Sequence, residues 1–248
     1  MKLTILGCSS AYPGPGGACS GYLVEEGDTK LLVDCGTGVL SNLQRVVAIK
    51  DVTHIVISHL HADHFLDLIP YRYALTRLLH EALHPLLYLP PGGVEGLLKA
   101  VSAFNTSPTF FSDLFWVDEY DPGASLRVGD LTIEFAPVKH YITSYAIAIS
   151  GSKRIVYSAD SGLCDGLAEL ARGADLFLCE ATRCQAEDGD WGHLSASETG
   201  ALARRAEVKQ LVLTHFWPDC DCSQSLEQAT AAFGKAVEVA EEFRTYIL

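Results

Sequence analysis

The sequence predicts an α/β protein with four layers, in which two β-sheets pack face to face and helices cover both outer sides. Two β-rich halves follow one another along the chain, and each half is flanked by segments of helical periodicity. Ligand-type side chains follow several of the predicted strands, as an α/β architecture with a site at its strand ends requires. Because no linker or low-complexity segment interrupts the pattern, we expect residues 1–248 to form a single compact domain.

The first half is predicted to begin with strands and to continue with helices. Strands are expected at residues 2–7, 21–26 and 30–34, with a Gly27-Asp28 turn joining the last two in a hairpin. A helix to about residue 47, a buried strand at 54–57, a helix at 65–83, a strand at 86–89 and a helix at 94–104 follow. Residues 8–20 are rich in Gly, Pro and Ser and predict a loop near the site.

The second half repeats the alternation of strands and helices. Strands are expected at 131–137, 145–150, 154–158, 175–179 and 210–214, helices at 163–171, 195–206 and 223–234, and one or two edge strands at 237–248. Between the halves, residues 105–120 contain Phe110, Phe111, Phe115, Trp116 and Tyr120. This aromatic stretch predicts either core packing or a wall that stacks on a ring.

Charge and composition limit which classes of binding partner and which cellular location the sequence favours. The formal net charge is −13, and Lys and Arg are scattered, so a structured RNA partner is disfavoured without a basic patch. No apolar run approaches the ~18 residues of a membrane span, and the first residues read as a strand rather than a signal sequence. Eight cysteines in a chain of this length do not indicate a disulfide scaffold. We therefore expect reduced cysteines, no membrane and a cytoplasmic location.

The densest group of ligand-type residues follows the predicted strand at 54–57. It contains His59, His61, Asp63 and His64 within six residues. In extended backbone, residues two apart point to the same side, so His59 and His61 can bind one metal ion together. Asp63 and His64 come where the chain turns into a helix and can point at a second ion. The stretch therefore predicts a metal centre.

Three further ligand-type residues follow strands of the second half. His140 follows the strand at 131–137, Asp160 the strand at 154–158, and His215 the strand at 210–214. Polar residues are common at strand ends, but three of them in addition to the histidine-rich stretch favour a shared site. The histidines at 80 and 84 are spaced as a helical pair, and we expect a surface or packing role for them.

This set of residues resembles the metallo-β-lactamase-fold superfamily, whose His-x-His-x-Asp-His, His, Asp and His pattern runs through the whole chain in order. The resemblance implies that His59, His61 and His140 hold one metal ion and that Asp63, His64 and His215 hold the second. Asp160 would bridge the two ions. The implied cofactors are two Zn²⁺ ions, with Mn²⁺ or Fe²⁺ as alternatives. Such a pair generates hydroxide from a bridging water near neutral pH.

Two further motifs resemble the ribonuclease Z-like phosphodiesterases of this superfamily. They are Glu180-Ala181-Thr182 at the end of a predicted strand and Gly192-His193-Leu194-Ser195 before a predicted helix. The resemblance implies that Glu180 orients His193, which contacts the phosphate or protonates the leaving oxygen. Asp63 would be both a ligand and a proton acceptor. The alternative is that Glu180 and His193 are an ordinary strand-end carboxylate and an ordinary helix-start residue.

The sequence also departs from ribonuclease Z. His140 and Asp160 are only 20 positions apart, which leaves room for two strands and a turn but not for the protruding tRNA-binding arm of that enzyme. We therefore expect a small phosphodiester substrate, with a cyclic nucleotide as the first candidate, in a pocket walled by residues 110–116. The alternatives are a tRNA 3′ endonuclease, a thioesterase or lactonase on the same metal scaffold, and a nucleotide-binding protein without turnover. The resemblance also raises a homodimer, which the sequence does not decide.

Overall fold

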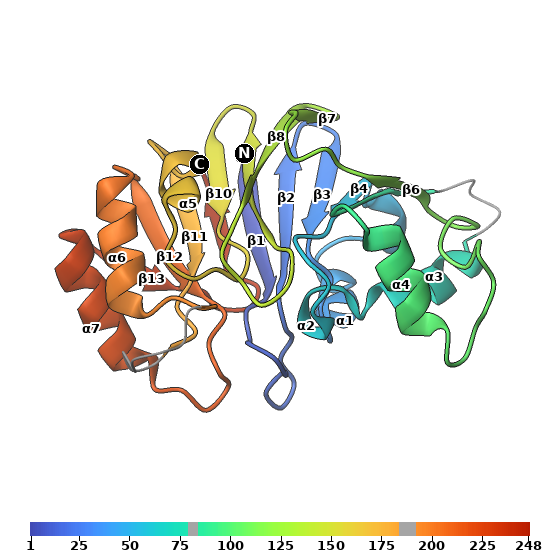
Figure 1. The fold of residues 1–248 in the computed structure, drawn as a ribbon, viewed down its shortest axis with the longest axis horizontal. Helices are drawn as coiled ribbons and strands as arrows, with labels where there is room; N and C mark the ends of the chain where they lie inside the picture. The colour runs from blue at the N-terminus through green and yellow to red at the C-terminus, as the bar shows by residue number, and fades with distance from the viewer. Residues whose placement is uncertain (79–83, 184–191) are drawn as a thin grey trace.

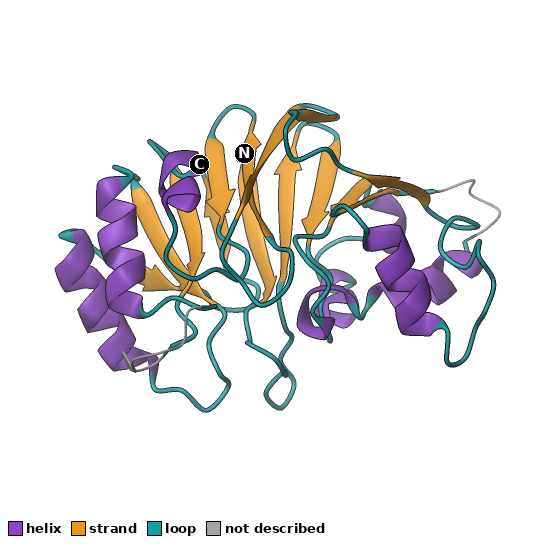
Figure 2. Cartoon of the chain, viewed as in Figure 1, coloured by secondary structure: helices purple, strands orange, loops and turns teal. Residues whose placement is uncertain are grey.

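The computed structural model describes residues 1–78, 84–183 and 192–248. It contains two seven-stranded sheets that pack face to face, with helices on both outer sides (Figures 1 and 2). The predicted four-layer αββα sandwich is therefore confirmed.

The first sheet has the strand order β14-β1-β2-β3-β4-β5-β6. Strands β1, β2 and β3 form an antiparallel meander, whereas β4, β5 and β6 continue from β3 in parallel. The C-terminal strand β14 pairs antiparallel with β1, which brings the two ends of the chain close together (Figure 1). The bounds are Lys2–Gly7, Gly21–Glu26, Thr29–Val33, His54–Val56, Leu86–Leu89 and Trp116–Glu119 for β1 to β6, and Thr245–Ile247 for β14.

The second sheet has the order β13-β12-β11-β10-β9-β8-β7. Strands β7 to β10 are antiparallel neighbours, whereas β10 to β13 run parallel. The bounds of β7 to β13 are Leu126–Val128, Leu131–Pro137, Tyr145–Ser150, Arg154–Tyr157, Leu176–Glu180, Gln210–Thr214 and Val237–Val239. The last segment of the chain therefore supplies an edge strand to each sheet, as its alternating pattern predicted.

Alternation of side chains along the strands produces three apolar layers. Leu31 and Val33 of β3 point inward to the core between the sheets, whereas Leu32 points outward toward the helices. The outer face of the first sheet is covered by α1 (Val39–Leu43), α2 (Ala62–Phe65), α3 (Leu68–Thr76) and α4 (Gly93–Val101). The outer face of the second is covered by α5 (Asp165–Leu170), α6 (Ala196–Arg205) and α7 (Cys222–Phe233). A 3₁₀ turn, η1, spans Ile49–Asp51.

The structure corrects the helix predicted over residues 65–83. Two short helices, α2 and α3, replace its first part, and residues 79–83, with the histidine at 80, lie outside the described residues. Pro70 lies in the first turn of α3, where the missing N–H costs nothing. Helix α2 begins at Ala62, so the chain turns into a helix between His61 and Asp63, as predicted. Helix α1 ends at Leu43, about one turn earlier than predicted.

The aromatic stretch at 105–120 is core and not a pocket wall. Phe110, Phe111 and Phe115 are buried in the layer between the first sheet and its helices. Tyr120 is buried between the sheets, stacked on Phe135 at 3.8 Å between ring centroids. Trp116 is 67% exposed, but it lies on β6 at the edge of the first sheet. The predicted substrate pocket walled by residues 110–116 is therefore wrong, because Phe110, Phe111 and Phe115 fill the core and Trp116 lies at a sheet edge.

A second hairpin escaped the sequence prediction, although its turn has the same signal as the first. Gly129-Asp130 joins β7 to β8, just as Gly27-Asp28 joins β2 to β3. Both glycines have positive φ, +54° and +53°, which two-residue hairpin turns require. The two turns meet, because the Thr29 hydroxyl accepts a hydrogen bond from the Asp130 backbone N–H at 2.9 Å. One sheet is thus tied to the other at this end.

The cysteines and the helices bear on two further predictions, that the cysteines are reduced and that no segment spans a membrane. Cys8, Cys19, Cys35, Cys164, Cys179 and Cys222 are free thiols, whereas Cys220 is disulfide-bonded. The expectation of reduced cysteines is therefore wrong for Cys220. Within residues 1–78, 84–183 and 192–248, no helix has the length and apolar character that crossing a membrane requires.

Candidate metal centre

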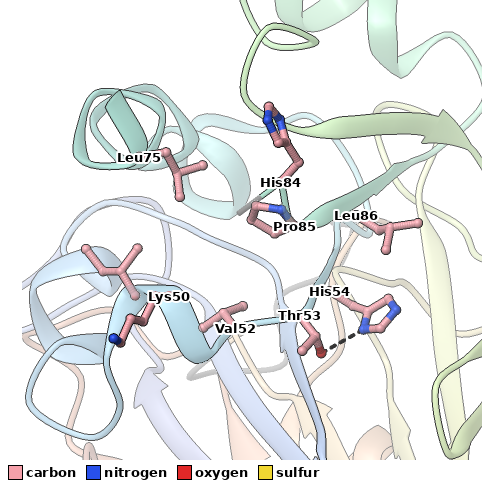
Figure 3. Close-up of a pocket in the computed structure, with 9 residues that line it drawn as sticks. Lys50, Val52, Thr53, His54, Leu75, His84, Pro85 and Leu86 are labelled. Atoms are coloured by element: carbon pink, nitrogen blue, oxygen red, sulfur yellow. Dashed lines mark hydrogen bonds between the residues drawn. The ribbon is translucent and has the colours of Figure 1, made fainter. Parts of the chain in front are cut away.

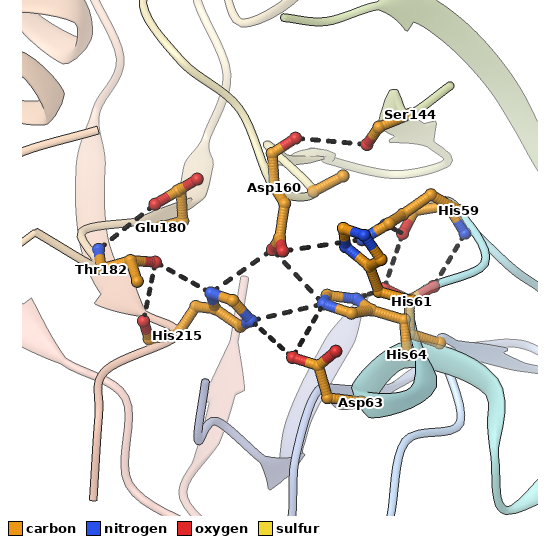
Figure 4. A network of polar contacts seen from close by, with 12 residues as sticks. His59, His61, Asp63, His64, Ser144, Asp160, Glu180, Thr182 and His215 are labelled. Carbon is orange, nitrogen blue, oxygen red and sulfur yellow. Dashed lines mark hydrogen bonds and ion pairs between the residues drawn. The ribbon is translucent and has the colours of Figure 1, made fainter. Parts of the chain in front are cut away.

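The predicted ligands lie together where strands of both sheets end. His59, His61, Asp63 and His64 follow β4 and enter α2, while His140 follows β8. The other two ligands follow parallel strands of the second sheet, Asp160 after β10 and His215 after β12. Parallel strands bring Asp160 and His215 to one edge of the second sheet, and the packing of the two sheets brings His215 to His64, 151 positions away in sequence. Figure 4 shows Asp160 between His215 on one side and His59 and His61 on the other.

The side chains form two groups that share one carboxylate. One group consists of His59, His61, His140 and Asp160, and the other of Asp63, His64, Asp160 and His215. Within each group, all ligand atoms lie within 4.8 Å of one another. The Asp160 Oδ2 atom lies 3.6 Å from the Nε2 atoms of His59 and His140, and its Oδ1 atom lies 3.3 Å from Nε2 of His64. Each oxygen of Asp160 therefore faces a different group.

Hydrogen bonds behind the imidazoles of His64 and His140 assign their tautomers. His64 donates from Nδ1 to a carboxylate oxygen of Asp34 at 2.8 Å, and His140 donates from Nδ1 to the backbone carbonyl of Gly192 at 2.8 Å. A neutral imidazole that donates from Nδ1 carries its lone pair on Nε2. Both rings therefore present Nε2 to the cluster as an acceptor.

Two hydroxyl groups have the same effect on His215 and His59. The Thr182 hydroxyl donates to the backbone carbonyl of His215 at 3.0 Å, so at 2.8 Å it must accept from Nδ1 of the same histidine. Likewise, the Ser58 hydroxyl donates to Asp34 at 2.8 Å and accepts from Nδ1 of His59 at 3.0 Å. His59 and His215 therefore also present a lone pair on Nε2.

The converging lone pairs fit metal ions. Nε2 of His64 lies 3.3 Å from Nε2 of His215, and Nδ1 of His61 lies 2.9 Å from Nε2 of His140. Two ligand nitrogens on one tetrahedral zinc, each at 2.0–2.1 Å from the ion, are roughly 3.3 Å apart. The buried His59 Nε2 and Asp160 Oδ1 atoms also lack a hydrogen-bond partner, which is costly unless a cation binds there. The residues present therefore fit bound metal.

Burial keeps three of the histidines, His59, His61 and His140, in the ligand form. Burial, followed by the neighbouring His64, lowers the pKa of His59 to about 4. Burial likewise lowers the pKa of His61 and of His140 below its usual value. Burial alone would raise the pKa of Asp63, but the neighbouring His215 and His64 lower it overall. At neutral pH His59, His61 and His140 are therefore neutral imidazoles and Asp63 is an ionised carboxylate, the states that bind metal. His64 differs, because Asp160 and Asp34 outweigh its burial and raise its pKa above the usual value, so a metal ion must displace a proton there.

Asp34 is the buried centre of the hydrogen bonds behind the site. Its carboxylate, 0% exposed, accepts from the backbone N–H and the hydroxyl of Ser58, both at 2.8 Å, from His64 and from the Tyr157 hydroxyl at 3.0 Å. Asp34 thus holds His64 directly and His59 through Ser58. Sequence reasoning used Asp34 only as the end of a strand. The sequence did contain a signal for this role: Asp34 directly follows an apolar strand, and the next predicted strand leads into the histidine-rich stretch.

Glu180 and His193 form the predicted pair beside the cluster. His193 donates from Nδ1 to the buried Glu180 carboxylate at 2.9 Å, which orients the ring so that Nε2 points away from Glu180. The His193 ring lies 5.0 Å from the His140 ring and 5.9 Å from the His215 ring, between centroids. Glu180 also accepts backbone hydrogen bonds from Ser161 at 2.7 Å and Leu194 at 3.3 Å. It therefore anchors the loop of His193 as well as its ring.

Strained backbone gathers around the cluster. Six residues other than glycine have positive φ in the described chain, and four of these border the site: Ala11, Asp34, Ala159 and His215, with φ between 52° and 62°. This conformation costs of order 1–3 kcal/mol per residue and persists where the surroundings hold it. At Ala11 the strained backbone directs its N–H to Asp63, to which it donates at 2.8 Å, and so helps to position this ligand. The predicted loop at 8–20 therefore does reach the site.

A separate hollow lies at the other end of β4 (Figure 3). It has a volume of about 250 Å³ and is lined by Ile49, Lys50, Val52, Thr53, His54, Leu75, His84, Pro85 and Leu86. His54 and His59 are five residues apart in nearly extended chain, or roughly 16 Å. The hollow is therefore distinct from the cluster. His84, predicted to have a packing role, lies with its ring against Trp116, 6.0 Å between centroids.

Fold and site together define a class of protein, a metallo-hydrolase of the β-lactamase fold. The family model for the beta-lactamase superfamily domain matches residues 29–216, about three quarters of the chain, and includes every predicted metal ligand. The chain therefore belongs to the beta-lactamase superfamily.

Relatives with known sequences or structures agree with this assignment. An uncharacterized protein of Mycobacterium leprae is 38% identical over 254 residues, covering 99% of this chain and 88% of that protein. The probable metallo-hydrolase YhfI of Bacillus subtilis is 33% identical, covering 97% of each chain. The crystal structure of YhfI superposes with a TM-score of 0.88 over 99% of this chain and 98% of that chain, at 30% identity. A ribonuclease Z of Mycobacterium bovis is 29% identical, covering 98% of this chain and 96% of that protein.

Proposed function

We propose that this protein is a phosphodiesterase that holds two zinc ions and hydrolyses a small phosphodiester, with a cyclic nucleotide as the first candidate. The observation that carries the proposal is the Glu180–His193 pair beside two ligand groups that share Asp160. When bound, the metal ions would supply Lewis acidity that activates water and neutralises charge on the phosphate. His59, His61 and His140 would hold one ion, Asp63, His64 and His215 the other, and Asp160 both.

The chain's own residues would move the two protons of the reaction. Glu180 accepts a hydrogen bond from Nδ1 of His193 at 2.9 Å and so stabilises the imidazolium form of that ring. His193 then donates a proton from Nε2 to the leaving ribose oxygen. Asp63, whose Oδ2 atom is held by the Ala11 N–H, accepts the proton that the attacking water loses. General acid and base catalysis of this kind contributes about 10²- to 10⁴-fold to the rate.

Two observations support a small substrate. The segment between His140 and Asp160 consists of a short loop, β9, a turn and β10, with no protruding arm. An open hollow beside this loop, of about 650 Å³, is lined by residues 137–144 other than Lys139 and includes His140 and Tyr141. A net charge of −13 also opposes a long polyanion.

Ribonuclease Z activity is the second candidate, because a relative of that name is 29% identical over nearly the whole chain. The test is a panel of substrates with metal-loaded protein: cyclic AMP, cyclic GMP, bis(p-nitrophenyl) phosphate and a precursor tRNA transcript. The proposal predicts metal-dependent turnover of the cyclic nucleotides. Specific 3′ cleavage of the transcript without cyclic-nucleotide turnover would favour the ribonuclease. Hydrolysis of thioesters or lactones alone would place the enzyme in a different reaction class.

A further inference from the structure

An exposed aromatic pair lies beside one half of the metal centre. Tyr12 is 49% exposed and Trp217 is 41% exposed, and their ring centroids are 6.0 Å apart at an interplanar angle of 50°. Single exposed apolar side chains are common, but two exposed rings in contact beside a candidate site mark a surface that a ligand or a partner can cover. The position of the two rings relative to the metal ligands indicates which kind of ligand would cover them.

Both residues are fixed to the site through their backbones. Tyr12 follows Ala11, whose N–H donates to Asp63 at 2.8 Å, and Trp217 comes two residues after His215. The two segments are joined to each other, since Ser10 donates to the carbonyl of Phe216 at 2.8 Å and Phe216 donates to the carbonyl of Cys8 at 3.2 Å. The strained residues Ala11 and His215, with φ of 57° and 62°, lie at the bases of the two segments. The pair is therefore held in place before a ligand binds.

We infer that Tyr12 and Trp217 form the subsite that stacks on the base of a nucleotide substrate and so determine specificity. The inference rests on the proposed function, because a phosphate held between the metal ions leaves the base of the same nucleotide to lie on the rim. Stacking requires an exposed ring face, no charge and no fixed hydrogen-bond pattern, which an indole beside a phenol provides. The rings that the sequence suggested for this role, at 110–116, are instead in the core or at a sheet edge.

Tyr141 is a further exposed ring near the metal ligands in the described part of the chain, but its surroundings give it a different role. Its ring lies 5.0 Å from the ring of His140 and 5.8 Å from that of His193, between centroids. A Cβ atom added to Gly192 would fall 2.5 Å from the same ring. Tyr141 thus packs on the loop that carries His193, on the side of the leaving group.

The test compares two substrates in matched variants. The substrates are cyclic AMP and the methyl riboside 3′,5′-cyclic phosphate, which keeps the phosphodiester but has no base. The variants are Trp217→Ala and Tyr12→Ala. Their controls are Trp116→Ala, exposed at the far sheet edge, and Tyr73→Ala, 49% exposed on α3. We expect kcat/KM for cyclic AMP, relative to the baseless substrate, to fall about tenfold through KM in the first two variants. The controls should keep the wild-type ratio, and Trp217→Phe should retain most of it.

A binding measurement separates this inference from the proposed function. With Trp116→Phe and Trp191→Phe, Trp217 is the last of the three tryptophans. Titration of metal-loaded protein with AMP should then quench its fluorescence, whereas ribose 5-phosphate should not. If no phosphodiester is hydrolysed but AMP still quenches Trp217, the proposed function fails and the stacking subsite stands. Unchanged substrate ratios in Trp217→Ala and Tyr12→Ala, or base-selective loss in Tyr141→Ala alone, would overturn the subsite.

Discussion

At the scale of single residues, the ligand nitrogens of four histidines, His59, His64, His140 and His215, are set by the partner behind each ring. Asp34, Thr182 and the carbonyl of Gly192 each accept from Nδ1 of one histidine, so that Nε2 faces the cluster. Partners of this kind typically change metal affinity 10- to 100-fold when they are removed. Ligand identity could be predicted from the spacing of His59 to His64, but these partners could not. They are brought to the ligands by strand pairing and not by sequence proximity.

Asp34→Asn tests the role of this buried carboxylate. The amide keeps the shape of the side chain but loses the charge and one acceptor oxygen, so Ser58, His64 and Tyr157 are no longer all satisfied. We expect zinc affinity, measured by competition with a chromophoric chelator, to fall about 10- to 100-fold. Asp118→Asn, on the exposed strand β6, is the control and should leave the affinity unchanged. Wild-type affinity in Asp34→Asn would show that the network does not orient the ligands.

His193→Ala tests the proposed proton donor. We expect kcat for cyclic AMP to fall at least about 100-fold, because the ribose oxygen is a poor leaving group without a proton. The loss should be much smaller with bis(p-nitrophenyl) phosphate, whose leaving group needs no proton. Metal content by elemental analysis should stay at the wild-type value, and His84→Ala provides the matched control. An equal loss on both substrates would instead assign His193 to phosphate binding.

At the scale of elements, short segments of close backbone contact position the ligands. Gly36 lies against α2, because Cys35 donates to the carbonyl of His64 at 2.7 Å and Asp67 donates to the carbonyl of Cys35 at 3.0 Å. Helix α2 is only four residues long, so these contacts rather than its own hydrogen bonds fix it. The direction of the chain after His61 could be predicted from the sequence. Apolar periodicity runs on through α2 and α3, so that the one signal for the break between them is Pro70, which lies in the first turn of α3.

Gly36→Ala tests this contact. A Cβ atom at Gly36 would lie 1.9 Å from the backbone carbonyl oxygen of Asp63, so α2 must move. We expect a loss of about 1–3 kcal/mol in the free energy of unfolding, together with weaker zinc binding. In the control, Gly166→Ala on α5, the nearest atom would be 3.5 Å away, an ordinary contact. Chemical denaturation of both variants, with and without zinc, distinguishes them, and equal stabilities would show that α2 is not held by Gly36.

At the scale of the whole molecule, the four layers bring together strand ends from both halves of the chain. The order of strands and helices, and hence the sandwich, could be predicted from periodicity and from the ligand pattern. The location of the aromatic residues could not, because Phe110 and Trp116 have the same chemistry and differ only in which face of the chain meets the core. The contact between Tyr12 and Trp217 could not be predicted for a similar reason. Each is a single aromatic residue in a loop, and only the fold brings the two rings together.

We propose that two metal ions, held by ligand groups that share Asp160, activate the hydrolysis of a small phosphodiester. The most direct measurement is the rate of cyclic AMP hydrolysis as zinc is titrated into the metal-free protein. Each group supplies four ligands, enough for one zinc ion. We therefore expect activity to rise until two equivalents of zinc per chain are bound and then to level off. A plateau at one equivalent, or no hydrolysis at any zinc loading, would contradict it.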